Sequence, residues 1–268
     1  MQTTFVARGI VVLAVLAAAI SFPAGDTARA AGSWFAGPNM SVARSYHSAT
    51  LLQDGRVLVA GGASFTARTN TAELYSPATN GWAPAASMSD SRWAHTATLL
   101  QNGKVLVVGG YDFNTSPVAT AVLYDPTTDS WSSAGTMANV RAVHTATLLQ
   151  NGKVLIAGGS NGAGSIDGAE LYDPATNSWS TARSMIQPRV GHTATLMLSG
   201  KVLVAGGGVA TAELYDPSSD TWTSAGAMST YRENASATLL PSGAVLVAGG
   251  DVSPGTSVAD VYDPASNA

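Results

Sequence analysis

The chain has 268 residues, of which 46% are hydrophobic, 11% are charged and 28 are glycine, and its formal net charge is −4. This composition is typical of a globular protein with many turns, and it argues against disorder. No basic cluster occurs, so we expect neither nucleic acid nor an anionic membrane surface as a partner. The absence of cysteine excludes disulfides, thiol nucleophiles and thiolate-bound metals.

The first 30 residues have the pattern of a secretory signal peptide. Arg8 supplies a positive charge, residues 10–20 form an apolar run, and Ala28-Arg29-Ala30 fits a small-x-small cleavage site. The alternative is a transmembrane anchor, but the run is shorter than the ~20 residues that a spanning helix needs. We therefore expect a mature domain over residues 31–268 that is secreted, periplasmic or on the cell surface, with no membrane insertion after cleavage.

Five internal repeats follow, near residues 40–82, 88–131, 137–179, 185–222 and 228–268. Each has a double glycine, and the first glycines of successive pairs are 48, 49, 48 and 43 residues apart. Each repeat also has a Leu-Tyr or Val-Tyr pair, and a tryptophan stands six residues before the methionine that opens each repeat. These tryptophans are Trp34, Trp82, Trp131, Trp179 and Trp222. Such regular self-similarity indicates an array of one repeated structural unit.

Each repeat is predicted to form four β-strands. In the third repeat, residues 144–150 and 153–157 are two strands joined by Asn151-Gly152, which predicts a two-residue hairpin turn. Residues 169–172 form a third strand, and Asp173-Pro174 provides a turn before a fourth strand that begins near Ser178. No long stretch has helical periodicity.

These residues resemble the kelch repeat family. The resemblance rests on the Arg-x-x-His start, the Gly-Gly strand end, the Tyr-Asp-Pro turn and the following tryptophan, over residues 34–263. It implies an all-β fold, a β-propeller of about five four-stranded blades stacked around an axis. It implies little about activity, because the family includes sugar oxidases, sialic-acid mutarotases and non-catalytic adaptors.

The two ends of the repeat region are complementary. Trp34 lies in a fourth-strand sequence with no strands before it, whereas the last repeat stops just before its expected tryptophan. We therefore expect the Trp34 strand to complete the blade begun near Ala235 and to close the ring. The alternative is a truncated chain of a longer propeller.

An arginine stands four residues after each of these methionines, and this column is the first candidate ligand site. Guanidinium groups that converge at a channel mouth would bind carboxylates, sulfates or acidic sugars. The alternative is a structural ion pair with an acidic column, which Val122 interrupts. The arginines are Arg44, Arg92, Arg141, Arg189 and Arg232, and the acidic residues are Glu73, Glu170, Glu213 and Asp260.

Two further features are candidate sites. Four repeats have a histidine three residues after the arginine, but the fifth has Ala235, so we expect a repeat position and no metal site. Tyr46 and Trp93 lie between the arginine and histidine columns, where other repeats differ, and they could stack on a sugar. The alternative for Trp93 is ordinary packing at a blade edge.

We therefore expect a non-catalytic binding or scaffold propeller with a protein or carbohydrate ligand and no cofactor. The alternative is a carbohydrate-active enzyme. A mutarotase-like epimerase would need an acid–base pair near an arginine, and Glu233 beside Arg232 is the candidate, with a surface salt bridge as its alternative role. An oxidase-like relative would lack the family's copper centre, because that centre needs cysteine.

Overall fold

The computed structural model describes residue 34 and residues 36–64, 67–251 and 256–266, so the predicted signal peptide lies outside the described residues. The described chain forms nineteen β-strands in five antiparallel sheets. Over these same residues, no helix is long and apolar enough to cross a membrane.

Each sheet, or blade, has its strands hydrogen-bonded in chain order. Blade 1 consists of β1 (Ser48–Leu51), β2 (Val57–Ala60), β3 (Ala72–Ser76) and β4 (Gly81–Ala85). Blade 2 consists of β5 (Thr96–Leu99), β6 (Val105–Val108), β7 (Thr120–Asp125) and β8 (Ser130–Thr136). Blade 3 consists of β9 (Thr145–Leu148), β10 (Val154–Ala157), β11 (Ala169–Asp173) and β12 (Ser178–Ala182). Blade 4 consists of β13 (Thr193–Leu196), β14 (Val202–Ala205), β15 (Val209–Asp216) and β16 (Thr221–Arg232), and blade 5 of β17 (Ser236–Leu239), β18 (Val245–Ala248) and β19 (Ala259–Tyr262).

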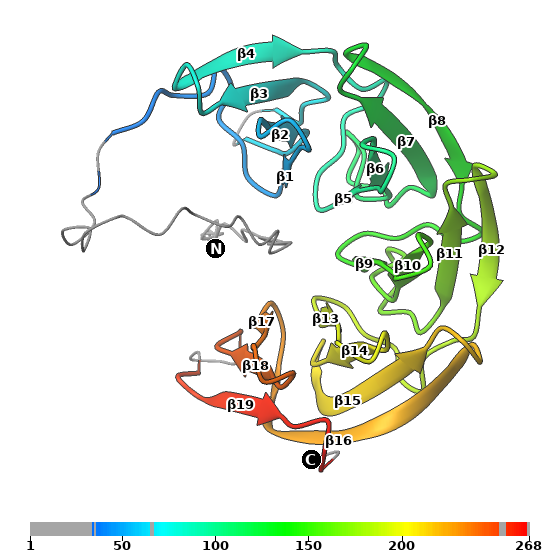
Figure 1. Ribbon diagram of the computed structural model, residues 1–268. Coiled ribbons are helices and arrows are strands. Elements are labelled where there is room, and N and C mark those ends of the chain that lie inside the picture. The colour runs from blue at the N-terminus through cyan, green and yellow to red at the C-terminus, as the bar shows by residue number, and fades with distance from the viewer. Residues whose placement is uncertain (1–33, 35, 65–66, 252–255, 267–268) are drawn as a thin grey trace, which may run out of the picture.

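The blades stand side by side around a central axis (Figure 1). The first strand of each blade lies nearest the axis and contacts the first strand of the next blade, from β1 to β17. The fourth strands β4, β8, β12 and β16 form the outer rim. This arrangement is the β-propeller that the repeats predict.

The first two strands of each blade are joined by a tight turn that differs from the predicted two-residue turn. In blade 1 the N–H of Gly55 donates to the carbonyl of Leu52, and the N–H of Leu52 donates to the carbonyl of Arg56. Gly55 has a φ of 84°, whereas Asp54 is not in the left-handed region. The loop therefore has three residues, with the glycine alone at positive φ, which is the next most common hairpin geometry.

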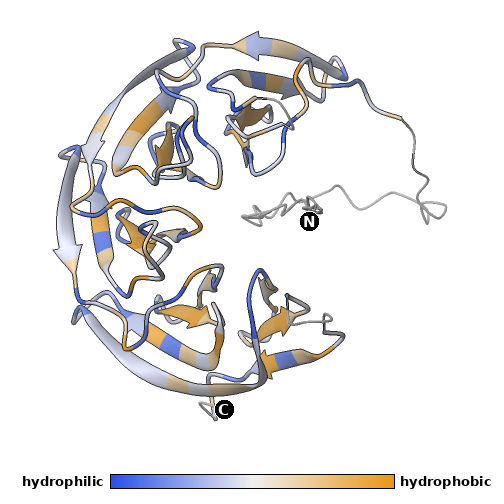
Figure 2. Cartoon of the chain, turned by 180° about the vertical axis from the view of Figure 1, so that it is seen from behind, coloured by the Kyte–Doolittle hydropathy of each residue, from blue (hydrophilic) through white to orange (hydrophobic). Residues whose placement is uncertain are grey.

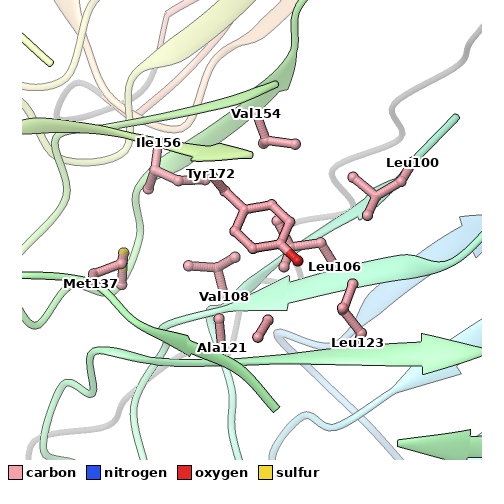
Figure 3. Packing of buried hydrophobic residues seen from close by; sticks show 10 residues of the cluster. Leu100, Leu106, Val108, Ala121, Leu123, Met137, Val154, Ile156 and Tyr172 are labelled. Atoms are coloured by element: carbon pink, nitrogen blue, oxygen red, sulfur yellow. The ribbon is translucent and has the colours of Figure 1, made fainter. Parts of the chain in front are cut away.

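Apolar side chains pack between neighbouring blades. The cluster between blades 2 and 3 joins Leu106, Val108 and Met137 to Ile156 and Tyr172, all 4% exposed or less (Figure 3). The second strand of each blade is the most hydrophobic, and the outer strands are pale in Figure 2. Burial follows the same order, since β6, β10 and β14 are buried throughout and β12 is mostly exposed. Stacking thus removes both faces of the second strands of blades 2, 3 and 4 from water.

The double glycine at the end of each second strand allows a close approach between blades. Gly109 has a φ of 60°, and a Cβ atom there would lie 2.4 Å from the carbonyl oxygen of Arg141 in the next blade's leading segment. Any side chain at this position would therefore clash with backbone as well as require a strained conformation.

The predicted closure of the ring by Trp34 is not confirmed. Trp34 is fully exposed, blade 5 has three strands among the described residues, and the arc is open between blades 1 and 5 (Figures 1 and 2). The N-terminal segment packs on blade 1 instead, where Trp82 Nε1 donates to the carbonyl of Pro38 at 3.0 Å. Trp131, Trp179 and Trp222 donate in the same way to the preceding blade. The segment thus takes the position of a preceding fourth strand without reaching blade 5.

Candidate functional site

The arginine column is buried inside the blades. The side chain of Arg44 is 0% exposed, and the other four arginines are 0–1% exposed. In blade 3, Arg141 Nη1 donates to the carbonyls of Gly158 and Gly168 at 3.0 and 2.8 Å. The equivalent atoms of the other four arginines make the matching pair of bonds. Each arginine therefore ties the end of the second strand to the start of the third.

Four of these arginines also form ion pairs with the acidic column of their own blade. The nitrogen–oxygen distances are 3.0 Å for Arg44–Glu73, 2.7 Å for Arg141–Glu170 and 2.8 Å for Arg189–Glu213, and Arg232 pairs with Asp260. Burial alone would raise the pKa of Glu73, but the N–H of Ser41 and the Arg44 guanidinium outweigh it and lower the pKa. This geometry favours the structural role. Ligand binding by the column stays a prediction.

Arg92 is the exception. It is 1% exposed, and Val122 occupies the position of the acidic residue in its blade. Its Nη2 donates to Thr120 Oγ1 at 3.1 Å, and its Nε has no partner. Burial lowers the pKa of Arg92, against an opposing effect of the Asp90 charge.

The histidine column joins neighbouring blades. His95 Nε2 lies 2.9 Å from Ser48 Oγ, His144 Nε2 lies 2.9 Å from Thr96 Oγ1, and His192 makes the same contact with Thr145. Burial, and then the charge of Arg92, lowers the pKa of His95 to about 3. These imidazoles are therefore neutral between blades. Among the described residues, no group of three or more histidines and carboxylates is placed to hold a metal ion.

A chain of backbone hydrogen bonds links the blades beside these histidines. The residue two positions after each arginine takes part: in blades 2 to 5 it donates its N–H to the equivalent carbonyl of the preceding blade, at 2.7–3.2 Å, and in blade 1 Tyr46 accepts from Ala94. All five residues have positive φ, from 52° to 64°, although Tyr46, Ala94 and Val143 are neither glycine nor asparagine. We call these five residues the collar. Its members are Tyr46, Ala94, Val143, Gly191 and Asn234.

Three aromatic side chains gather where blades 1 and 2 meet the collar. The ring centroids of Tyr46 and Trp93 lie 5.5 Å apart, and those of Trp93 and Tyr111 lie 4.6 Å apart with planes inclined by 32°. All three side chains are half-buried, and Trp93 Nε1 has no hydrogen-bond partner. The structure therefore brings together the two aromatic residues that the sequence singled out, and it adds Tyr111.

Tyr111 was missed as an individual candidate because it lies at the start of a variable loop after Gly109-Gly110. The sequence does not show that Tyr111 pairs with Trp93, whereas in the structure these two residues exchange backbone hydrogen bonds at 2.8 and 3.0 Å. Arg68 of the equivalent loop in blade 1 was also missed, and its buried Nε has no partner. Glu233, the acid–base candidate, is half-buried, and its carbonyl accepts from the N–H of Asp251.

Comparisons with known proteins agree with this architecture. A family model described as the Kelch motif matches residues 43–89, 92–138 and 141–186, which make up just over half of the chain. A search of curated proteins found no match. The chain is similar to a solved structure titled "Structure of YjhT", with a TM-score of 0.68 and 19% identity, covering 81% of this chain and 80% of that one. At that identity, the likeness supports the fold alone.

Proposed function

Because the chain belongs to the kelch-motif family, we propose that it is an exported, non-catalytic binding propeller. Its ligand, a glycan, docks on the aromatic cluster formed by Tyr46, Trp93 and Tyr111. The single observation that carries this proposal is the stacking of these three rings, at centroid distances of 5.5 and 4.6 Å, across two neighbouring blades. The apolar faces of a sugar ring pack well on such rings.

The repeat scaffold does not require aromatic residues at these positions. Where blade 2 has Trp93, other blades have Ser45, Ala142 and Val190, and they build the same collar. Tyr46 has a φ of 53°, a conformation that is costly for a tyrosine and that Ala94, Val143, Gly191 and Asn234 also adopt in the collar. Because the collar forms with other side chains, aromatic residues at positions 46 and 93 are candidates for ligand contact.

Two buried hydrogen-bond donors in these blades, Trp93 Nε1 and Arg68 Nε, have no protein partner. Phe113, two residues after Tyr111, is 63% exposed on the same loop. Apolar rings with a few directed donors are the usual composition of a small-ligand site.

A glycan array probed with residues 31–268 tests the binding role, and mass spectrometry of exported protein tests cleavage near Ala31. For any glycan bound, Trp93→Ala and Tyr111→Ala are expected to weaken binding at least tenfold without lowering the melting temperature by more than a few degrees. Tyr231→Ala is the matched control, because Tyr231 is 52% exposed and lies outside the cluster. Equal binding by Trp93→Ala and wild type would rule out this site.

A further inference from the structure

Four blades hold a carboxylate in the same set of donors, which we call the cradle. One carboxylate oxygen accepts from the first backbone N–H after the methionine column, at 2.6–3.0 Å, and the arginine of that blade donates to the carboxylate as well. In blades 3 and 4 a second N–H also donates, from Asn139 at 3.3 Å and Gln187 at 3.2 Å. The carboxylate thus joins the arginine to the segment before it.

Blade 2 builds the same cradle without the carboxylate. The N–H of Met88 donates to Asn70, as that of Met137 donates to Ala119, so the backbone enters the cradle in the same way. Arg92 Nη1 makes the same two carbonyl bonds as its counterparts, so the guanidinium has the same orientation. Val122 replaces the acidic residue and offers no acceptor.

Among the described residues, Arg92 consequently has no carboxylate partner, although Nη1 and Nη2 donate to oxygens of Gly109 and Thr120. Arg92 is 1% exposed, and its Nε lacks a hydrogen bond, as do the Nε atoms of Arg141 and Arg232. The backbone N–H groups of Ser89 and Asp90 form no hydrogen bond either. Val122 is half-buried, whereas Glu73, Glu170 and Glu213 are 2–3% exposed. Val122 is thus shorter than a glutamate and more exposed than the carboxylates at the equivalent positions.

From these observations we propose that the blade 2 cradle binds a small carboxylate anion, of the formate or acetate class, between Arg92 and the N–H groups of Ser89 and Asp90. A planar two-oxygen anion fits because, in blades 1, 3 and 4, Oε2 accepts from backbone N–H and Oε1 from arginine. Hydrogen bonds from charged donors to a carboxylate are among the strongest in proteins.

Asp90 is the acidic group closest in sequence to this cradle. It is exposed, it accepts a hydrogen bond from Ser89 Oγ at 2.8 Å, and it forms no ion pair with Arg92 among the described residues. Its charge offsets part of the cost of burying Arg92 and repels a bound anion. Asp90 therefore weakens the site without occupying it.

The test is the melting temperature of residues 31–268 at pH 7 as sodium acetate replaces a bulky sulfonate at constant ionic strength. We expect a logarithmic rise in wild type, of about 5–10 °C at a hundredfold excess over Kd. Val122→Glu supplies the carboxylate of the other blades, so it should melt at a higher temperature without acetate and lose the dependence. Val122→Thr is the matched control, because it keeps the shape without a charge and should respond like wild type.

A flat acetate response in wild type would overturn the proposal without any variant, and so would an undiminished response in Val122→Glu. Asp90→Asn is a surface substitution that tests the site even where Val122→Glu does not fold. Removing this charge is expected to lower severalfold the acetate concentration that gives a chosen rise in melting temperature, and an unchanged concentration for that rise would also overturn the proposal.

Discussion

Replacement of Arg141 by alanine is expected to destabilise the propeller strongly. Arg141 is 0% exposed, donates to the carbonyls of Gly158 and Gly168, and pairs with Glu170 at 2.7 Å. The substitution leaves Glu170, which is 2% exposed, with only the N–H groups of Ala138 and Asn139. Breaking a buried ion pair from one side costs about 3–5 kcal/mol. For a domain of this size, that corresponds to a fall of roughly 6–20 °C in melting temperature.

Thermal unfolding followed by circular dichroism measures the effect. Arg183→Ala is the matched control, because the Arg183 side chain is exposed and a surface substitution is expected to change stability by less than about 0.5 kcal/mol. The double variant Arg141→Ala with Glu170→Ala should lose less than the sum of the two single changes, since neither charge is then left unpaired. An Arg141→Ala protein that melts with wild type would refute a structural role for this ion pair.

Three further outcomes are expected. Trp34→Ala should leave the melting temperature unchanged, because Trp34 is fully exposed, whereas a loss of about 3–5 kcal/mol would show instead that Trp34 closes the ring. The free energy of unfolding should fall as pH decreases from 6.5 towards 3, because the pKa of His95 and of His192 is lowered to about 3 in the folded chain and the unfolded chain binds more protons in that window. Urea titrations at several pH values should show that this free energy depends less on pH in His95→Asn than in wild type. An identical pH dependence would contradict the buried neutral imidazole. Val143→Asn should stabilise the protein by about 1 kcal/mol, because Val143 has a φ of 54° and asparagine tolerates that region. A loss of stability in chemical denaturation would show that the packing of the valine side chain outweighs the backbone strain.

Repeat spacing predicts the fold well because each blade is a local structure with its own turns. The third repeat yields strands at Thr145–Leu148, Val154–Ala157, Ala169–Asp173 and Ser178–Ala182, within a few residues of the predicted ranges. The hairpin turn was predicted with the wrong length, since Asn151-Gly152 suits both geometries and only the backbone hydrogen bonds distinguish them. Closure of the ring stays a prediction, because complementary ends do not determine the angle between blades and most of the predicted closing strand lies outside the described residues.

The candidate sites were predictable to the extent that they depend on register. The sequence indicates both the arginine column and the break at Val122, but it does not say which arginine pairs with which strand. The structure pairs each arginine with the third strand that follows it, so Arg92 lacks the carboxylate and Arg141 does not. Tyr111 contacts Trp93 although the two residues are 18 positions apart. They occupy different positions of the repeat, so aligning the repeats does not bring them together.

The collar has a direction, because four of its residues, from Asn234 back to Ala94, each donate to the collar residue of the preceding blade, and Tyr46 accepts the last of these bonds. Every repeat therefore brings one N–H and one carbonyl, and a copy inserted in register satisfies both of its neighbours. Duplication of a repeat can lengthen such an array without new side-chain chemistry, whereas a proline at a collar position would interrupt it by removing one N–H. The blade number is thus free to change in evolution while the lining of the axis stays the same.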